Sequence, residues 1–163
     1  MNTVAQFMKV SKEQFEKDWN DCFPGVESPF DSIKLPNRAT KGSAGYDFYT
    51  PTSIMISPGE TYKFPTGIRA KIDEGWVLMM FPRSGLGFKY MIQLCNTVGV
   101  IDSDYYNADN EGHMFIKLVN MGKETVMIKA GAAVAQGVFM PFGIVAGDDA
   151  DGIRTGGFGS TNK

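Results

Sequence analysis

The first periodic pattern in the chain is a short amphipathic segment near the N-terminus. Phe15 and Trp19 are four residues apart, so a helix places them on the same face. Ser11 and Gln14 have the spacing of a capping box, and Pro24–Gly25 interrupts the pattern. The sequence therefore predicts a helix that begins near Ser11 and packs its apolar face on the main body.

After this segment the pattern changes to short apolar or alternating runs. Gly, Pro, Asn or Asp interrupts them roughly every 8 to 12 residues, which is typical of a β-sandwich or barrel. We expect strands at Ile33–Leu35, Tyr46–Tyr49, Thr52–Ile56, Thr61–Phe64, Gly67–Lys71, Trp76–Phe81, Ile92–Leu94, Gly99–Ile101, Met114–Asn120, Thr125–Ile128 and Ala132–Pro141. The fold class is therefore predicted to be all-β.

Three parts of the chain follow from these patterns. Residues 1–30 are interpreted as an N-terminal helical extension, and residues 31–146 as one β-domain. Residues 147–163 contain few apolar side chains, so we expect a flexible C-terminal arm unless a ligand orders it.

Composition narrows the classes of function. The net charge of −2 over 163 residues argues against nonspecific binding to nucleic acid or to an anionic membrane. Cys22 and Cys95 have neither a disulfide-scaffold nor a zinc-ligand spacing, and no run of about 18 apolar residues occurs. We therefore expect a cytoplasmic protein that acts on a small ligand.

Two internal segments carry candidate chemistry. Pro82–Gly87 combines Arg, Ser and Gly, which supply the donors that hold phosphate oxygens, although a structural turn with Arg83 paired to a carboxylate explains it too. Asp102 and Asp104 are two residues apart, so they share one face in a strand and can diverge in a turn. Spacing alone assigns neither carboxylate a role.

The C-terminal segment Gly156–Thr161 places one aromatic ring among glycines and hydroxyl residues. Such a strip can fold over a base and its phosphates, with the ring stacked on the base. An ordinary flexible terminus is the alternative interpretation.

Five segments in this order resemble the motifs of the trimeric dUTPase family, the deoxyuridine triphosphate nucleotidohydrolases. The five segments are Gly42–Phe48, Pro82–Gly87, Asn96–Tyr105, Gly131–Gln136 and Arg154–Thr161. The resemblance implies a jelly-roll β-barrel or sandwich of the dUTPase-like, β-clip type, in a bacterial or bacteriophage member.

The resemblance also implies a reaction. Water attacks the α-phosphate of dUTP in line and releases dUMP and pyrophosphate, which keeps uracil out of DNA and supplies dUMP for thymidylate synthesis. Asp102 matches the catalytic aspartate that orients the water. Mg²⁺ is the implied cofactor, held mainly by the substrate phosphates, with Asp47 as its expected protein partner through water.

Substrate-binding roles are likewise implied by the family. Asn96 and the main chain of the hairpin that follows match the part that reads uracil, and Tyr105 matches the ring that excludes a ribose 2′-hydroxyl. Phe158 matches the ring that stacks on uracil, with Gly159 beside it. The full substrate-binding set is Arg83, Ser84, Gly85, Asn96, Gly99, Val100, Ile101, Tyr105, Gln136, Arg154, Phe158, Gly159, Ser160 and Thr161.

In the family three subunits share their active sites, so a homotrimer is the expected assembly. Gln136 would act from a neighbouring subunit, and the arm would close as a lid, with Arg154, Ser160 and Thr161 on the β- and γ-phosphates. The chain departs from the family pattern by inserting Tyr106–Asn110 after the third motif, which lengthens the loop beside the sugar pocket.

Two other functions remain as alternatives. A dCTP deaminase-like enzyme needs a strand glutamate as acid and base, but Lys117 stands where we expect it. A nucleotide-responsive regulatory or binding protein would use the arm or the N-terminal helix to meet a protein partner. His113, the sole histidine, is interpreted as a hydrogen-bonded or surface side chain and not as a catalytic one.

Overall fold

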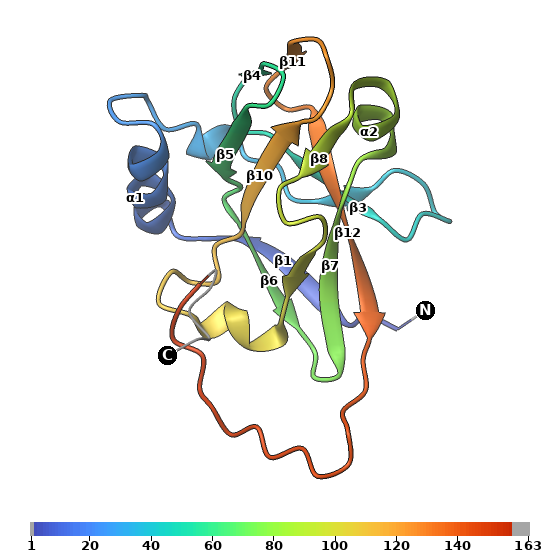
Figure 1. Cartoon of the computed structure of the whole chain (residues 1–163). Coiled ribbons are helices and arrows are strands. Elements are labelled where there is room, and N and C mark those ends of the chain that lie inside the picture. The colour runs from blue at the N-terminus through green and yellow to red at the C-terminus, as the bar shows by residue number, and fades with distance from the viewer. Residues whose placement is uncertain (1, 158–163) are drawn as a thin grey trace.

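The computed structural model describes residues 2–157, which form mostly strands, as predicted (Figure 1). The helices are α1 (Lys12–Cys22) and α2 (Ser84–Tyr90), with 3₁₀ turns at Phe30–Ser32 and Ser103–Asn107. The strands are β1 (Ala5–Lys9), β2 (Asn37–Arg38), β3 (Tyr46–Tyr49), β4 (Ile54–Ile56), β5 (Thr61–Pro65), β6 (Ile68–Ile72), β7 (Trp76–Pro82), β8 (Ile92–Leu94), β9 (Gly99–Ile101), β10 (Phe115–Asn120), β11 (Val126–Ile128) and β12 (Ala133–Pro141).

The strands pair antiparallel in four sheets. The largest has the order β2-β3-β12-β7-β9, a second has the order β5-β10-β8, and two further pairs are β1-β6 and β11-β4. Strands β10 and β11 alternate buried and exposed residues, as strands with one face on a core do. The apolar faces meet in a core that includes Phe48, Phe64, Leu78 and Leu118, all 1% exposed or less.

The N-terminal segment is part of this core. Phe15 and Trp19 of α1 are 0% and 2% exposed, and their rings stack with centroids 5.7 Å apart. The predicted cap is present, because the Ser11 hydroxyl accepts a hydrogen bond from the Gln14 amide. Strand β1, which the pattern did not predict, pairs with β6. The division at residues 1–30, 31–146 and 147–163 stays a prediction, and the described contacts show residues 5–22 packed on the β-domain.

Two local predictions are wrong. Ile33–Leu35 is not a strand, because the chain follows a 3₁₀ turn there and only Ile33 of the three is buried. The segment expected to be a strand-to-loop turn is helix α2, which continues to Tyr90 despite two glycines. Met91 ends α2 in the left-handed conformation at φ 56°, which closes the helix on the Gly87 and Leu86 carbonyls.

Strand β7 determines where the candidate residues lie. It pairs with β12 along its whole length, and with β9 only over Leu78–Met80. Arg83 therefore follows one end of β7, whereas Asp102, directly after β9, lies near the other end. Counted along the register at about 3.3 Å per residue, the two positions are about 20 Å apart.

Within residues 2–157 no helix is long and apolar enough to cross a membrane.

Candidate active site

The first part of the site joins the third motif to the C-terminal arm. Arg154 Nη1 lies 2.7 Å from Asp102 Oδ2 and 3.2 Å from Asp104 Oδ1, so the two carboxylates converge on one guanidinium. Both carboxylates remain about half exposed. Figure 1 shows the arm leaving β12 and returning beside the 3₁₀ turn that follows Asp102.

Electrostatics strengthens this contact. Burial alone would lower the pKa of Arg154, but hydrogen bonds to Asp102 and Asp104 outweigh it and hold the pKa above its ordinary value. The guanidinium is therefore fully charged and offers its donors to whichever anion lies closest. In this structure that anion is the candidate catalytic carboxylate.

Tyr105 lies beneath the same arm. Its side chain is 3% exposed, and the Arg154 guanidinium lies 5.1 Å from the ring centroid. The hydroxyl donates to the His113 carbonyl at 2.6 Å and accepts from the Asn110 amide at 2.9 Å. Burial raises the pKa of the phenol, so Tyr105 is a neutral, fixed ring.

A second cluster lies at the other end of β7. Arg83 Nε is 3.4 Å from Asp47 Oδ1 of β3, so Arg83 pairs with a carboxylate in this structure, although the segment is a helix and not the turn that this alternative assumed. A bulge between Ala133 and Ala135 sets the register that places Gln136 opposite Asp47. The Gln136 amide donates to the Pro82 carbonyl at 3.3 Å. The first, second and fourth motifs therefore meet within one chain, and the expectation that Gln136 joins Arg83 from a neighbouring subunit is wrong.

A cavity of 370 Å³ opens beside this cluster at the start of α2. It is lined by Arg83, Ser84, Gly85 and also Lys89, which the sequence interpretation missed. Lys89 lies three residues after Leu86, so on a helix the two side chains are on the same face. The sequence interpretation missed Lys89 because it did not predict helix α2. The cavity thus adds a second cation to the three predicted phosphate-binding residues.

The predicted uracil-reading segment surrounds the short strand β9. Gly99 and Ile101 are buried, Val100 is half exposed, and Asn96 precedes the strand on an exposed turn. Asn96 lines a cavity of 320 Å³ together with Lys63, Cys95, Phe115 and Lys117. Lys117 pairs directly opposite Lys63 across β10 and β5.

The loop that follows Tyr105 contains contacts that no motif predicted. Arg69 of β6 donates to the Tyr106 carbonyl at 2.6 Å, and its guanidinium lies 3.7 Å from the Tyr106 ring centroid. Glu111 accepts from both the amide and the hydroxyl of Ser11. No local pattern signals pairs separated by so many residues, so only the structure reveals them.

No three His, Cys, Asp or Glu side chains of residues 2–157 gather as a metal site. Mg²⁺ keeps several waters and binds through one or two carboxylates plus substrate phosphates, so carboxylates such as Asp47, Asp102 and Asp104 are the type of donor that it would need. Asp47 already has Arg83 as its cationic partner. The half-exposed Asp102 and Asp104 are the other carboxylates near the predicted substrate path.

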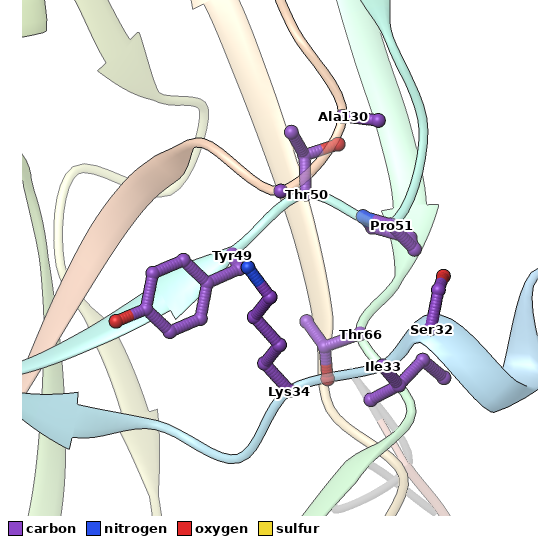
Figure 2. A pocket seen from close by; sticks show the side chains of 9 residues that line it. Ser32, Ile33, Lys34, Tyr49, Thr50, Pro51, Thr66 and Ala130 are labelled. Carbon is purple, nitrogen blue, oxygen red and sulfur yellow. The ribbon is translucent and has the colours of Figure 1, made fainter.

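Another cavity, of 240 Å³, lies between β3 and the segments around residues 32 and 130 (Figure 2). Lys34 extends toward Tyr49, with its ammonium 5.9 Å from the ring centroid. Thr66, which also lines the cavity, donates its hydroxyl hydrogen to the Met114 carbonyl. None of the predicted site residues lines this cavity, so we do not assign it to the reaction.

The predicted site is thus divided. Arg83, Ser84, Gly85 and Gln136 lie at one end of β7, whereas Asp102, Tyr105 and Arg154 lie at the other. The remaining predicted positions, Phe158, Gly159, Ser160 and Thr161, lie outside the described residues.

Comparisons with known proteins show which family the chain resembles. The dUTPase family model matches residues 31–162. The deoxyuridine 5′-triphosphate nucleotidohydrolase of Lactococcus lactis is 48% identical over 132 residues, which cover 79% of this chain and 88% of the relative.

Solved structures show the same fold. The dUTPase of Streptococcus mutans superposes with a TM-score of 0.66 at 38% identity, covering 86% of this chain and 98% of that chain. A mutant dUTPase of phage phi11 of S. aureus, described as coordinating a structural Mg(II) ion, has a TM-score of 0.66 at 19% identity and covers 92% and 98%. The all-β, dUTPase-like fold is confirmed, and the chain belongs to the dUTPase family.

Proposed function

We propose that this chain hydrolyses dUTP to dUMP and pyrophosphate, and so keeps uracil out of DNA while supplying dUMP for thymidylate synthesis. The observation that carries the proposal is the contact between Arg154 of the fifth motif and Asp102 of the third, 2.7 Å apart, in a member of the dUTPase family. The third and fifth motifs, which are far apart in the sequence, therefore meet at Asp102, the proposed catalytic residue.

Asp102 is the proposed catalytic residue. Its carboxylate accepts a hydrogen bond from the attacking water and from the sugar 3′-hydroxyl, which directs the water toward the α-phosphorus. Before substrate binds, Arg154 holds this carboxylate. A triphosphate offers more negative charge to the guanidinium, so substrate can draw Arg154 from Asp102 to the phosphates and leave Asp102 free for the water.

The remaining roles follow the chemistry of each side chain. Arg83 and Lys89 supply positive charge, and Ser84 and Gly85 supply further donors, in one cavity of phosphate-binding size. Gln136 adds a neutral donor beside them. We assign uracil to Asn96 and the main chain of Gly99, Val100 and Ile101, and assign the stacking and phosphate contacts of the closed lid to Phe158, Gly159, Ser160 and Thr161.

Mg²⁺ is the proposed cofactor, and when bound it neutralises the charge that develops on the phosphates. The phage protein described with a structural Mg(II) ion supports a divalent ion in this fold. A water-mediated contact from Asp47 to the ion stays a prediction. Its ion pair with Arg83 supports the alternative in which Asp47 orients a phosphate-binding guanidinium.

A homotrimer with shared active sites is the proposed assembly. Arg83 and Asp102 lie about 20 Å apart along β7, farther than one triphosphate extends. A site that uses both residues therefore needs a second copy of the chain. Asp102→Asn and Arg83→Ala should each be inactive alone, and co-expression should restore activity in mixed trimers. Failure of the two variants to complement each other would contradict shared sites.

Deamination of dCTP is disfavoured by the cavity beside Asn96. Two lysines, Lys63 and Lys117, face each other there, where a deaminase needs a carboxylate to move protons. A regulatory protein partner stays a prediction without a described surface to support it. A cytoplasmic location follows from the proposed substrate, because bacterial nucleotide pools and DNA synthesis are cytoplasmic.

Pyrophosphate release from dUTP, dCTP, dTTP and UTP, each with and without Mg²⁺, tests the function. We expect release from dUTP alone, stimulated by Mg²⁺. Ammonia release from dCTP would instead indicate the deaminase. No product from any of the four nucleotides would contradict an enzymatic function and favour a nucleotide-binding protein, which calorimetry with dUTP would then detect.

A further inference from the structure

The loop Ser103–Gly112, called here the sugar loop, turns tightly so that its end packs against Tyr105 near its start. Glu111 and Gly112 both have positive φ values, 58° and 69°. A Cβ placed on Gly112 would lie 2.6 Å from the Tyr105 carbonyl oxygen, so only glycine fits there. The left-handed conformation is strained for a residue other than glycine, so Glu111 needs contacts that hold it.

The N-cap of helix α1, Ser11, supplies those contacts. The Ser11 amide donates to Glu111 Oε2 at 2.8 Å, and the Ser11 hydroxyl donates to Oε1 at 2.6 Å. Glu111 thus replaces the reciprocal half of the capping box, since Gln14 turns instead to Asp18. Its carboxylate also faces the positive end of the helix dipole.

The charge of Glu111 is stabilised in this position. Burial would raise the pKa of the carboxyl group, but the hydrogen bonds from Ser11 and the charge of Arg69 outweigh it and lower the pKa below its ordinary value. Arg69 also donates to the Tyr106 carbonyl. The loop is therefore held from β6 as well as from α1.

A second anchor, Asp18, lies about two turns further along α1. Asp18 Oδ2 is 2.5 Å from Nδ1 of the fully buried His113. Because the Gly67 amide donates to Nε2 at 2.8 Å, Nδ1 carries the hydrogen and donates it to Asp18. The backbone carbonyl of the same His113 accepts from the Tyr105 hydroxyl. One fixed residue therefore connects the helix to the proposed sugar-contacting ring.

We propose that α1 is a positioning element for nucleotide selection: Ser11 and Asp18, through Glu111 and His113, fix Tyr105 so that it excludes a 2′-hydroxyl. Glu111 is a positioning residue and not a catalytic one. This inference rests on the proposed function, because it assigns Tyr105 to the deoxyribose. It gives the N-terminal helix a part in dUTP selection.

The decisive measurement is the ratio of kcat/KM for dUTP to that for UTP, because the active fraction of a preparation cancels in the ratio. In Glu111→Ala we expect the ratio to fall by about tenfold, within the range by which one small group in a pocket is normally discriminated. Hydrogen exchange of residues 103–112 should become faster in the same variant. Glu111→Gln keeps the length and can satisfy both Ser11 groups, so it should restore most of the ratio.

Glu16→Ala is the matched control on the same helix, since Glu16 forms only the exposed pair with Lys12 among the described salt bridges. It should leave both the ratio and the exchange unchanged. A Glu111→Ala variant with a lower melting temperature, but an unchanged ratio and unchanged exchange, overturns the positioning role. A wild-type chain that does not hydrolyse dUTP overturns the proposed function instead, and the exchange of residues 103–112 then still decides whether α1 holds the loop.

Discussion

The two ends of the chain meet the same segment, residues 102–113, in different ways. From the N-terminal side, α1 contacts Glu111 and His113, with Phe15 and Trp19 buried in the core behind it. From the C-terminal side, the arm contacts Asp102 and Asp104 through Arg154. A hydrogen bond from the Asp109 amide to the Thr155 carbonyl adds to this contact.

The difference lies in the apolar surface behind each contact. Trp19 is 2% exposed, whereas Ile153 next to Arg154 is 90% exposed. Polar contacts without buried apolar surface exchange readily with water or with a charged ligand. Burial of aromatic rings, by contrast, stabilises the position of a segment. The helix is thus suited to hold the loop in place, and the arm is suited to leave it when substrate arrives.

Asp102→Asn should have the largest effect of these changes, because Asp102 is the proposed catalytic residue that the arm contacts. The amide cannot act as a base toward the water, so turnover of dUTP should fall by about 10²–10⁴-fold. Nucleotide binding and the unfolding free energy should be nearly unchanged. Steady-state kinetics with a dUTP binding assay checks this, and ordinary turnover would refute the role of Asp102.

Trp19→Ala should weaken the packing of α1 on the core. The indole stacks on Phe15, packs at a tilt against Phe23, and donates to the Val26 carbonyl at 3.0 Å. Removal of a buried Trp side chain typically costs about 3–5 kcal/mol. Urea denaturation measures the loss, and a loss below about 1 kcal/mol would show that α1 is not part of the core.

Asp18→Asn should alter the acid stability of the same helix. Burial would raise the pKa of Asp18, but hydrogen bonds from His113 and Gln14 outweigh it and lower the pKa below 3.8. A lowered pKa stabilises the fold above the ordinary value, and that stabilisation disappears as the pH falls through the folded pKa. The variant should lose about 1.5–3 kcal/mol at neutral pH.

The difference between wild type and Asp18→Asn should shrink as the pH falls from the ordinary carboxyl pKa, about 4, toward the lower pKa of the folded protein, because the unfolded chain then binds a proton that the folded protein does not. Thermal melts from pH 3 to pH 7 measure it. A difference that stays constant across this range would contradict a charged Asp18 in the folded protein.

Deletion of residues 154–163 should have the smallest effect on stability. The described part of the arm, residues 147–157, buries little apolar surface, so the unfolding free energy should change by less than about 0.5 kcal/mol. Hydrolysis of dUTP should nevertheless slow by about tenfold or more, because the lid and its phosphate donors are lost. Parallel melts and kinetics test this, and an unchanged rate would show that the arm is not a lid.

Local patterns predicted most of the fold because most elements carry their own signal. The helix began after Ser11 as its cap indicated, and strands such as β8 and β9 have the expected bounds. Strand β1 was missed because it gains its hydrogen bonds from β6, more than fifty residues later in the chain. Helix α2 was missed because two glycines in seven residues have low helix propensity.

The candidate site shows the same division. Recognisable motifs identified Asp102, Arg83 and Gln136 as residues suited to binding a nucleoside triphosphate. They did not predict that Arg83 would pair with Asp47, or that Asp102 would lie at the opposite end of β7. Lys89 was not recognised, because its place in the cavity depends on a helix that the sequence pattern did not predict.

The sequence by itself determined the family, the all-β class and the types of side chain available for the reaction, because each rests on short-range spacing of residues. Only the tertiary structure decided which of those residues meet and how firmly they are held. Register along β7 separates Arg83 from Asp102, and burial of α1 turns Ser11 and Asp18 into anchors of the sugar loop. Such contacts join residues about a hundred positions apart, and their strength comes from the removal of water around them, which no local pattern records.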